Sequence, residues 1–406
     1  MKTSNVDKSA RVVVTGGSGL VGKALQLELS RAGFNEIITA SSKDCDFTKA
    51  EETLACFQSW QPTYVFHMAA KVFGIGGNAS FPGDSIFENT LINTNVVHAC
   101  KEVGVEKVVA MGSGCVYPDI GTIDLKEGQI WNGPPHGSEE YYGHAKRLLL
   151  SQLEAYQKQF GLNYVYAISG NIYGPNDNFN LENSHVVPSL VHRFHLAMEQ
   201  SKILDVWGTG SAVRDFSYSH DTARALIVAL ETLNGAVNVG SGEKSTIKNV
   251  VSILNSIHGD KLEIKWDNSK PDGQLHRAYD LSKLFGAGFR PEYSLEDGLI
   301  ATVNWFSAAK LRHFLEKSPP TKSEKSSKNT WLLFDVEHTK LQFSLCRAQS
   351  HSCKQIAMLP LPREDSLHYE KQLNQFQIIQ EVCPKFPTCS FHCKQPGSLE
   401  LVVLGQ

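Results

Sequence analysis

Arg11–Gly22 has the sequence RVVVTGGSGLVG, a β-branched run followed by Gly16, Gly19 and Gly22 at three-residue spacing, and it leads into a helical pattern from Leu20 to Ala32. Such a strand, turn and helix bring backbone N–H groups at the helix N-terminus close to a phosphate, an approach that a Cβ in the turn would block. We therefore predict a dinucleotide-binding loop whose phosphate contacts come from Gly16, Ser18, Gly19, Leu20, Val21 and Gly22.

Further apolar runs follow at the spacing of strand–helix–strand units: Glu36–Ala40, Tyr64–Ala69, Lys107–Gly112 and Tyr164–Ser169. Their near-continuous hydrophobicity is typical of parallel strands buried on both faces. The predicted fold class is α/β, a doubly wound parallel sheet of the Rossmann type with a smaller α/β substrate lobe. After Asn171 the rhythm changes, and the glycine-rich segment Trp207–Tyr218 is predicted to be turn-like.

Domain limits follow from these changes of character. We predict an NADP-binding domain over residues 1–175, with 215–240 returning to it, and a nucleotide-sugar-binding lobe over 176–214 and 241–317. Residues 318–330 are rich in Pro, Ser and Lys, as in a linker. Residues 331–406 form a C-terminal extension of unknown role. Its Cys383, Cys389, His392 and Cys393 do not have a recognised zinc spacing, so no metal is predicted.

The 406 residues have a net charge of −3, 41% hydrophobic residues and nine cysteines. This balance gives no electrostatic reason to expect nucleic acid or an anionic membrane as a partner. The N-terminus shows no apolar signal segment, and the early cysteines lie far apart, as free thiols in a reducing compartment do. The expectation is a cytoplasmic protein.

The second strand ends in Ser41-Ser42-Lys43, at the distance from the glycine loop where such folds contact the adenosine ribose. A carboxylate there binds the 2′-OH of NAD, whereas hydroxyls and a cation suit a 2′-phosphate. Ser42 and Lys43 therefore predict NADP as cofactor, although Asp44 and Asp46 lie close by.

Tyr142 and Lys146 are four residues apart, which places both on one face of a predicted helix. A phenol titrates near ~10, and an adjacent ammonium lowers its pKa toward the range of acid–base catalysis. Ser113 follows the Lys107–Gly112 strand and supplies a second hydroxyl. The three residues are a candidate catalytic group for chemistry at a carbonyl.

Together with the glycine loop and Asn171-Ile172-Tyr173-Gly174-Pro175, this group resembles the extended short-chain dehydrogenase/reductase superfamily over about residues 10–310. More specific segments resemble the GDP-L-fucose synthases. They are Ala69–Val72 with Gly74, Ile75 and Asn78, Gly112–Pro118, Gly174–Phe179, Asn183–Pro188 with Arg193–His195, Val206–Gly210 with Arg214–Phe216, and Lys270–Gly273 with Asp280 and Ser282–Leu284.

The resemblance implies NADPH-dependent conversion of GDP-4-keto-6-deoxy-D-mannose to GDP-L-fucose, by C3/C5 epimerisation and C4 reduction. It also implies Cys115 as base and His185 as acid, and cofactor contacts from Ala69, Lys146, Asn171 and His185. Arg193, Arg214 and Lys270 are candidate partners of the substrate pyrophosphate because cations bind it well. Asp272 and Trp207 complete the candidate substrate site, and a homodimer is expected.

Two positions depart from the family pattern. Gly114 replaces a serine or threonine, and Ser169-Gly170 replaces Pro-Thr. Both changes remove side-chain volume, so a related epimerase or 4-reductase acting on a GDP-deoxyheptose is an alternative, as is a non-catalytic NADP-binding protein. At the residue level Cys115 is alternatively a small buried side chain, His185 a helix cap and Trp207 a core residue.

Overall fold

The protein is described by a computed structural model over residues 6–72, 80–119, 121, 124–200, 202–270 and 272–317, and five later strands. Two compact units are present: residues 1–255 with 261–295, and residues 256–260 with 296–406. The first unit contains every candidate site residue. Gly74, Ile75 and Asn78 of the family segment lie outside the described residues, and so does the predicted linker except for Thr330.

The first unit is built on a six-stranded sheet with the order β2-β1-β3-β4-β5-β9, in which every neighbouring pair is parallel. The strands are β1 (Val12–Thr15), β2 (Ile37–Ala40), β3 (Tyr64–His67), β4 (Lys107–Met111), β5 (Asn163–Ser169) and β9 (Gly235–Val239). The predicted parallel α/β sheet is thereby confirmed.

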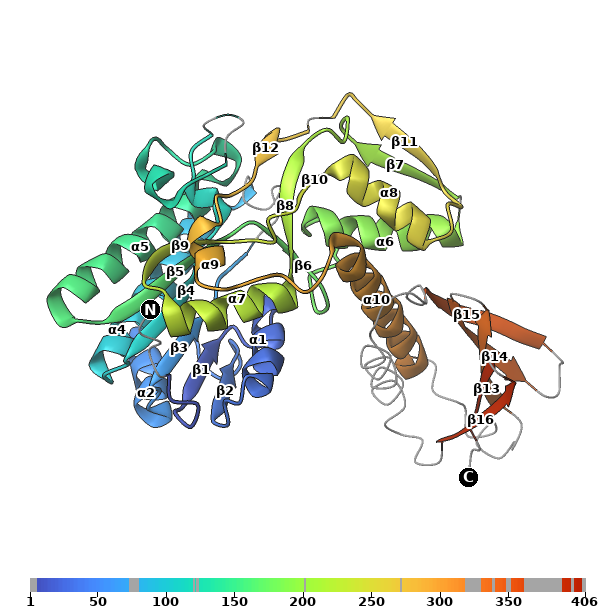
Figure 1. Ribbon diagram of the computed structural model, residues 1–406, viewed down its shortest axis with the longest axis horizontal. Coiled ribbons are helices and arrows are strands. Elements are labelled where there is room, and N and C mark those ends of the chain that lie inside the picture. The colour runs from blue at the N-terminus through green and yellow to red at the C-terminus, as the bar shows by residue number, and fades with distance from the viewer. Residues whose placement is uncertain are drawn as a thin grey trace. The chain divides into compact units, whose positions relative to one another are not determined.

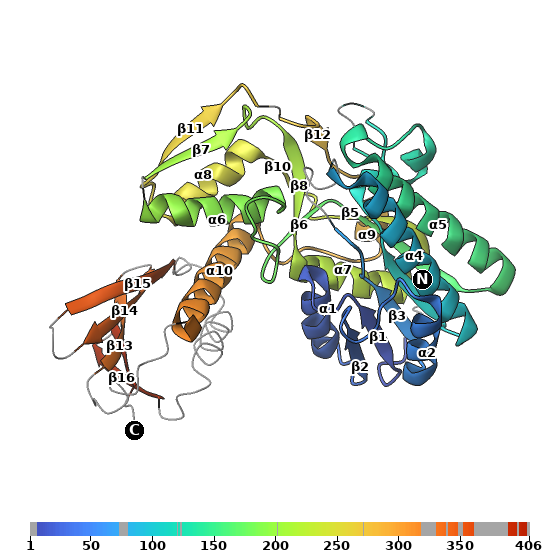
Figure 2. The ribbon, with the colours of Figure 1, turned by 180° about the vertical axis from the view of Figure 1, so that it is seen from behind.

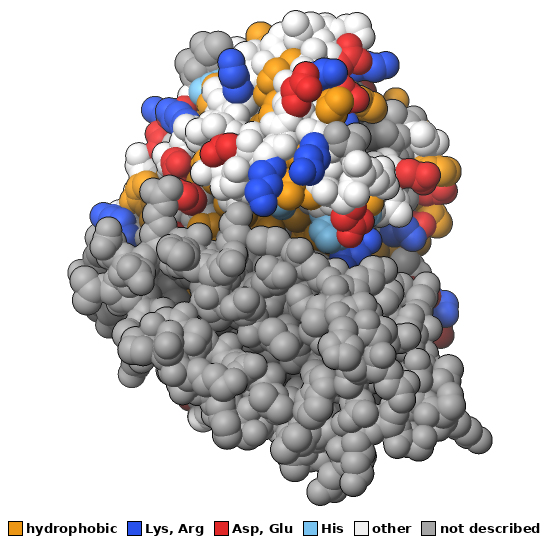
Figure 3. Space-filling view, turned by 90° about the vertical axis from the view of Figure 1, so that its right-hand side faces the viewer, with side chains coloured by type: hydrophobic (Ala, Val, Ile, Leu, Met, Phe, Trp, Pro, Cys, Tyr) orange, Lys and Arg blue, Asp and Glu red, His pale blue; other side chains and the backbone are white. Residues whose placement is uncertain are grey.

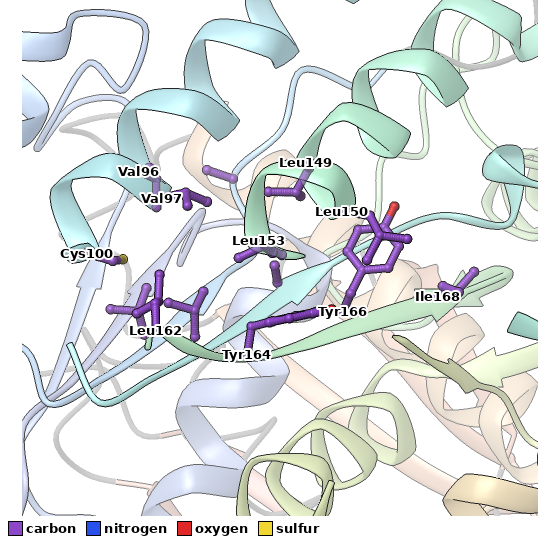
Figure 4. Close-up of a cluster of buried hydrophobic side chains, with 14 of the residues drawn as sticks. Val96, Val97, Cys100, Leu149, Leu150, Leu153, Leu162, Tyr164, Tyr166 and Ile168 are labelled. Atoms are coloured by element: carbon purple, nitrogen blue, oxygen red, sulfur yellow. The ribbon is translucent and has the colours of Figure 1, made fainter. Parts of the chain in front are cut away.

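Helices cover both faces of this sheet (Figures 1 and 2). On one face α2 (Ala50–Trp60), α4 (Pro82–Glu102) and α5 (Glu140–Phe160) contribute to one buried cluster. On the other face α1 (Leu20–Arg31) and α7 (Ser219–Thr232) contribute to a second. Figure 4 shows the first cluster, where Val97 and Cys100 of α4 and Leu149 and Leu153 of α5 lie over Tyr164 of β5. Burial on both faces explains the uninterrupted apolar strands.

A second group of strands belongs to the same unit. In a four-stranded sheet β8 (Val213–Tyr218) pairs with β10 (Lys244–Thr246), β12 (His276–Arg277) and β6 (Asn171–Tyr173). A separate pair joins β7 (Ile203–Trp207) to β11 (Glu263–Asp267). The helices of this region are α6 (Val186–Glu199) and α8 (Ile247–Ile257), whereas α9 (Ser282–Gly286) packs against β9 of the six-stranded sheet, where its Leu284 joins the second buried cluster.

The prediction of a turn over Trp207–Tyr218 is wrong for half of that segment. Val213–Tyr218 forms β8, the strand to which three others pair. Gly208 and Gly210 have φ of +79° and +73°, so the predicted turn is present only in the short segment between β7 and β8 that contains these glycines.

The second unit contains most of α10 (Leu295–Lys317) and two antiparallel sheets. One consists of β13 (Thr330–Glu337), β14 (Lys340–Arg347) and β15 (Ser352–Pro360), the other of β16 (Cys389–Gln395) and β17 (Ser398–Val403). Cys389, His392 and Cys393 lie on β16, and Cys383 lies outside the described residues.

Over the described part of the chain, no helix is both long and apolar enough to cross a bilayer. The same residues contain no group of three or more His, Cys, Asp or Glu placed to hold a metal ion. Figure 3 shows one face of the molecule, on which cationic and anionic side chains of the described residues are interspersed.

Candidate active site

The glycine loop leaves the carboxyl end of β1 and makes Gly19 the N-cap of α1. Gly16 has φ +69°, and a Cβ there would lie 2.8 Å from the backbone N of Ala69. A Cβ on Gly22 would lie 2.3 Å from the carbonyl oxygen of Gly16. These contacts require glycine, and Ser18 and Gly19 are exposed to receive a ligand. The loop therefore fits a pyrophosphate at a helix N-terminus.

The loop after β3 meets the loop after β1, because these neighbouring strands lie where the chain order of the sheet reverses. The hydroxyl of Thr15 accepts a hydrogen bond from the Ala69 N–H at 3.2 Å and lies 2.9 Å from Nδ1 of His67. Nε2 of His67 lies 3.0 Å from Oδ1 of Asn93. Burial lowers the pKa of His67 to about 3, so its imidazole is neutral. Ala69 is thus held beside Gly16.

At the end of β2 both nearby carboxylates are already hydrogen-bonded. Asp44 accepts from the N–H and hydroxyl of Ser41, and these bonds lower its pKa. Asp46 accepts from the N–H and hydroxyl of Thr48. Ser42 and Lys43 are exposed. The two carboxylates that complicated the prediction of NADP are therefore engaged locally.

The structure brings together the three residues of the candidate catalytic group. Ser113 is the N-cap of a short 3-10 helix, η1 (Gly114–Val116), and accepts a hydrogen bond from the N–H of Cys115 at 3.3 Å. Nζ of Lys146 donates to the carbonyl of Met111 at 2.8 Å and lies 5.8 Å from the ring centre of Tyr142. The ammonium and the phenol therefore lie near the end of β4 that leads to Ser113.

Burial sets the protonation of these groups. It lowers the pKa of Lys146 to about 8, because the cation loses solvation. Burial also raises the pKa of Tyr142, and the nearby Cys115 and Glu139 raise it further. The protein accordingly holds a neutral phenol beside a lysine whose pKa is lowered to about 8.

Cys115 is buried among charged groups that sequence analysis did not identify. Glu139 forms an ion pair of 2.8 Å with Arg277 and is an electrostatic neighbour of the Cys115 thiol. Burial, with the charge of Glu139, raises the pKa of Cys115 to about 12. Burial lowers the pKa of His185, and Glu139 opposes that shift. Cys115, Tyr142 and His185 thus share Glu139 as an electrostatic neighbour.

Glu139, Arg277 and Tyr279 are the site residues that the sequence analysis missed. Glu139 precedes Tyr142 by three residues, a spacing that brings both to one side of a helical turn. Arg277 and Tyr279 are two apart in an extended segment, so their side chains lie on one face. They are far from the glycine loop in sequence, and the pairing of β12 with β8 and the bridge between Tyr279 and Leu125 bring them here.

The five candidate substrate residues fall into two places. Arg214 lies opposite Arg277 in the pairing of β8 with β12 and, with Arg277 and Glu139, forms a charged cluster. Burial lowers the pKa of Arg214 to about 10. Arg193, Trp207, Lys270 and Asp272 lie near the ends of β7 and β11. There Nζ of Lys270 lies 5.7 Å from the Trp207 ring centre, and Arg193 donates to the carbonyl of Asp205. Asp272 accepts from the N–H of Thr209 at 2.7 Å, so this carboxylate fixes the turn after β7.

The structure also bears on the alternatives for single residues. His185 is the N-cap residue of α6, but its side chain makes no capping hydrogen bond. Trp207 is 64% exposed, so it is not a core residue. Cys115 is buried, and its charged neighbours distinguish it from an ordinary apolar core position.

Comparisons with known proteins give a consistent result. The model of the NAD dependent epimerase/dehydratase family matches residues 12–240. GDP-L-fucose synthase 1 of Arabidopsis thaliana is 37% identical over 307 residues, which are 75% of this chain and 95% of that protein. A GDP-L-fucose synthetase from Naegleria fowleri bound to NADP has a TM-score of 0.70 and 29% identity over 75% of this chain and 95% of its own. A GDP-6-OMe-4-keto-L-xylo-heptose reductase from C. jejuni has a TM-score of 0.71 and 26% identity over 75% of this chain and 99% of its own.

Proposed function

Because this chain belongs to the NAD dependent epimerase/dehydratase family, and within it is related to the GDP-L-fucose synthases, we propose that it converts GDP-4-keto-6-deoxy-D-mannose to GDP-L-fucose. It is an NADP-dependent oxidoreductase with epimerase activity. The observation that supports this most is that Ser113, Cys115, Tyr142 and Lys146 meet at the end of β4, with His185 coupled to them through Glu139.

Cys115 and His185 are the proposed acid–base pair for inversion at C3 and C5. The protons on these carbons are acidic because their loss gives an enolate conjugated with the C4 ketone. Cys115 takes the proton from one face and His185 returns one to the other. The inversion requires the thiolate of Cys115 and the imidazolium of His185, so the thiol proton ends on the imidazole. The charge of Arg277 favours the thiolate and that of Glu139 favours the imidazolium, against the burial that keeps both groups neutral.

Ser113 and Tyr142 are the proposed hydroxyls at the C4 oxygen. Donors fixed at the place where negative charge develops stabilise both the enolate and the alkoxide. NADPH supplies the hydride that reduces C4. Tyr142 donates the proton to the alkoxide, and the Lys146 ammonium stabilises the phenolate that remains, because opposite charges at close range favour the ionised form.

Cofactor and substrate contacts follow the same proposal. The glycine loop with Ala69 holds the pyrophosphate of NADP, Ser42 and Lys43 its 2′-phosphate, and Lys146, Asn171 and His185 surround the nicotinamide end. Arg214 binds the substrate on the side of the charged cluster. Arg193, Trp207, Lys270 and Asp272 bind the nucleotide, and the lobe over residues 176–214 and 241–317 is the substrate-binding domain.

The test is incubation of the purified protein with NADPH and GDP-4-keto-6-deoxy-D-mannose in D2O. We expect one NADPH consumed per product, GDP-L-fucose as product by NMR, and deuterium at C3 and C5. Absence of turnover with this substrate contradicts the proposal.

A GDP-4-keto-heptose reductase is the second candidate, and the structural similarity to the C. jejuni reductase favours it. The same assay distinguishes the two: a reductase alone consumes NADPH without placing deuterium at C3 or C5. A non-catalytic NADP-binding protein gives neither signal.

We also propose that the protein is a cytoplasmic homodimer paired through α4 and α5. Large apolar side chains are exposed on these adjacent helices, with Phe87 63% and Leu148 47% exposed. Cys45, Cys56, Cys100 and Cys115 are free thiols, which suits a reducing compartment. Light scattering should give the mass of two chains, and Phe87→Asp should reduce it to one.

A further inference from the structure

Tyr279 occupies the space at both positions where this chain departs from the family pattern. A Cβ on Gly114 would lie 2.1 Å from the Tyr279 hydroxyl oxygen and 3.1 Å from Cζ. A Cβ on Gly170 would lie 2.5 Å from Cε2 of the same ring and 2.7 Å from its oxygen. No side chain fits at either position beside this tyrosine. The volume removed at the two glycines is therefore filled, and does not enlarge the site for a bulkier sugar.

The Tyr279 ring is held on several sides. The side chain is 4% exposed. Its backbone forms a β-bridge with Leu125, which is fixed by hydrogen bonds of 2.9 Å on both sides of Tyr279, to Ala278 and Asp280. The ring centre lies 6.1 Å from that of Tyr117, whose hydroxyl donates to Asn238 at 2.6 Å. A ring fixed in this way is a rigid support.

What the ring supports is the turn between two proposed catalytic residues. Gly114 joins Ser113 to Cys115, and Ser113 caps this turn through the N–H of Cys115. A change of position at Gly114 therefore moves a hydroxyl and a thiol together. Displacements of about 1 Å in a catalytic group cost on the order of 100-fold in rate.

We propose that Tyr279 is a positioning residue, whose ring packs against Gly114 and Gly170 and holds Ser113 and Cys115 in register with the sugar. This inference rests on the proposed function. The ring and not the hydroxyl has the positioning role, because the Tyr279 hydroxyl has no hydrogen-bond partner among the described residues.

The two glycines allow a test in which one variant is rescued and the other is not. Gly114→Ala places its Cβ nearest the hydroxyl, so adding Tyr279→Phe removes the closest atom and leaves 3.1 Å to Cζ. Gly170→Ala places its Cβ 2.5 Å from Cε2, which phenylalanine retains. Gly286→Ala is the matched control, since a Cβ there has no atom within 4 Å.

We expect Gly114→Ala to lower kcat about 100-fold for both NADPH oxidation and deuterium entry at C3 and C5, with KM and NADP binding little changed. Gly170→Ala should also lower kcat. Adding Tyr279→Phe should restore most of the lost kcat in Gly114→Ala and none of it in Gly170→Ala. Gly286→Ala should match the wild type. Thermal unfolding of each variant checks that it is folded.

Tyr279→Phe alone should retain activity and should not lower Tm, because it removes a buried hydroxyl without a partner. A wild-type kcat in Gly114→Ala, or failure of Tyr279→Phe to rescue that folded variant, overturns the inference. So does a tenfold loss in Tyr279→Phe at unchanged Tm, which assigns the role to the hydroxyl. An inactive wild type instead contradicts the proposed function.

Discussion

At the scale of single residues, the groups of the site are held in states that are not yet reactive. Burial raises the pKa of both Cys115 and Tyr142, so each is neutral at physiological pH. Charge then develops only where a nearby cation stabilises it, Arg277 for the Cys115 thiolate and Lys146 for the Tyr142 phenolate. Side chains that start out neutral can exchange protons with the substrate during the reaction, and they do not bind it through a permanent charge.

Tyr142→Phe should lower the rate of C4 reduction by about 100-fold or more, because it removes the proton donor. The measurement is NADPH oxidation with the keto-sugar substrate. Tyr141→Phe is the matched control, since this neighbouring phenol is 48% exposed. Near-normal turnover in Tyr142→Phe would falsify the role of that phenol.

Cys115→Ser should block deuterium entry at C3 and C5 from D2O while NADP binding stays unchanged. A hydroxyl is a far weaker acid than a thiol and does not replace it as base. Cys56→Ser is the control, as this free thiol is on α2, outside the charged cluster. If exchange persists in the serine variant, another residue is the base.

The lowered pKa of Lys146 predicts how kcat/KM changes on the alkaline side of its pH profile. The pKa of Lys146 is lowered to about 8, so its ammonium, present below that pH, is lost as pH rises through it. We expect kcat/KM to fall above about pH 8 in the same way. For stability the sign is opposite, since an unfolded lysine still binds its proton up to ~10.4, and folding gains over that window as pH rises. A flat activity profile up to pH 9.5 would contradict the assignment of this limb to Lys146.

At the scale of elements, the residues of the site are positioned chiefly by the junctions between consecutive elements. The glycine loop between β1 and α1, the turn η1 after β4, and the Gly170 link between β5 and β6 each depend on residues without a Cβ. Close packing of backbone against backbone or ring is what they share, so volume added at these junctions is costly.

Gly22→Ala should weaken NADP binding about tenfold or more, because its Cβ would lie 2.3 Å from the carbonyl oxygen of Gly16 and displace the loop. Titration calorimetry with NADP measures the effect. Gly83→Ala in α4, where a Cβ meets nothing within 4 Å, should bind as the wild type does. Equal affinities for both variants would show that the loop tolerates the shift.

At the scale of the whole molecule, all the proposed chemistry lies in the first unit. The relatives match about three quarters of this chain while being covered almost completely themselves, for example 95% of the Arabidopsis protein. The two antiparallel sheets after residue 330 contribute no residue to the site as proposed. Activity should therefore not depend on them.

A chain that ends at Lys317 should retain the kcat and KM of the full chain for NADPH and substrate. The assay is NADPH oxidation by both forms at equal concentration, with thermal unfolding to confirm that the shorter form is folded. A folded but inactive shorter chain would assign the C-terminal unit a part in catalysis.

The sequence alone was sufficient for the parallel sheet, the glycine loop and the grouping of Ser113, Tyr142 and Lys146. Each of these features leaves a pattern within a single segment of the chain: continuous apolar strands, regularly spaced glycines, and a tyrosine and a lysine four residues apart. It did not reveal Glu139, Arg277 or Tyr279 beside Cys115, nor why Gly114 and Gly170 are glycines. The positions of Arg277 and Tyr279 require β12 to pair with β8 and Tyr279 to bridge to Leu125, contacts between segments more than sixty residues apart in sequence. Such pairing is determined by how whole elements pack, and no local pattern records it.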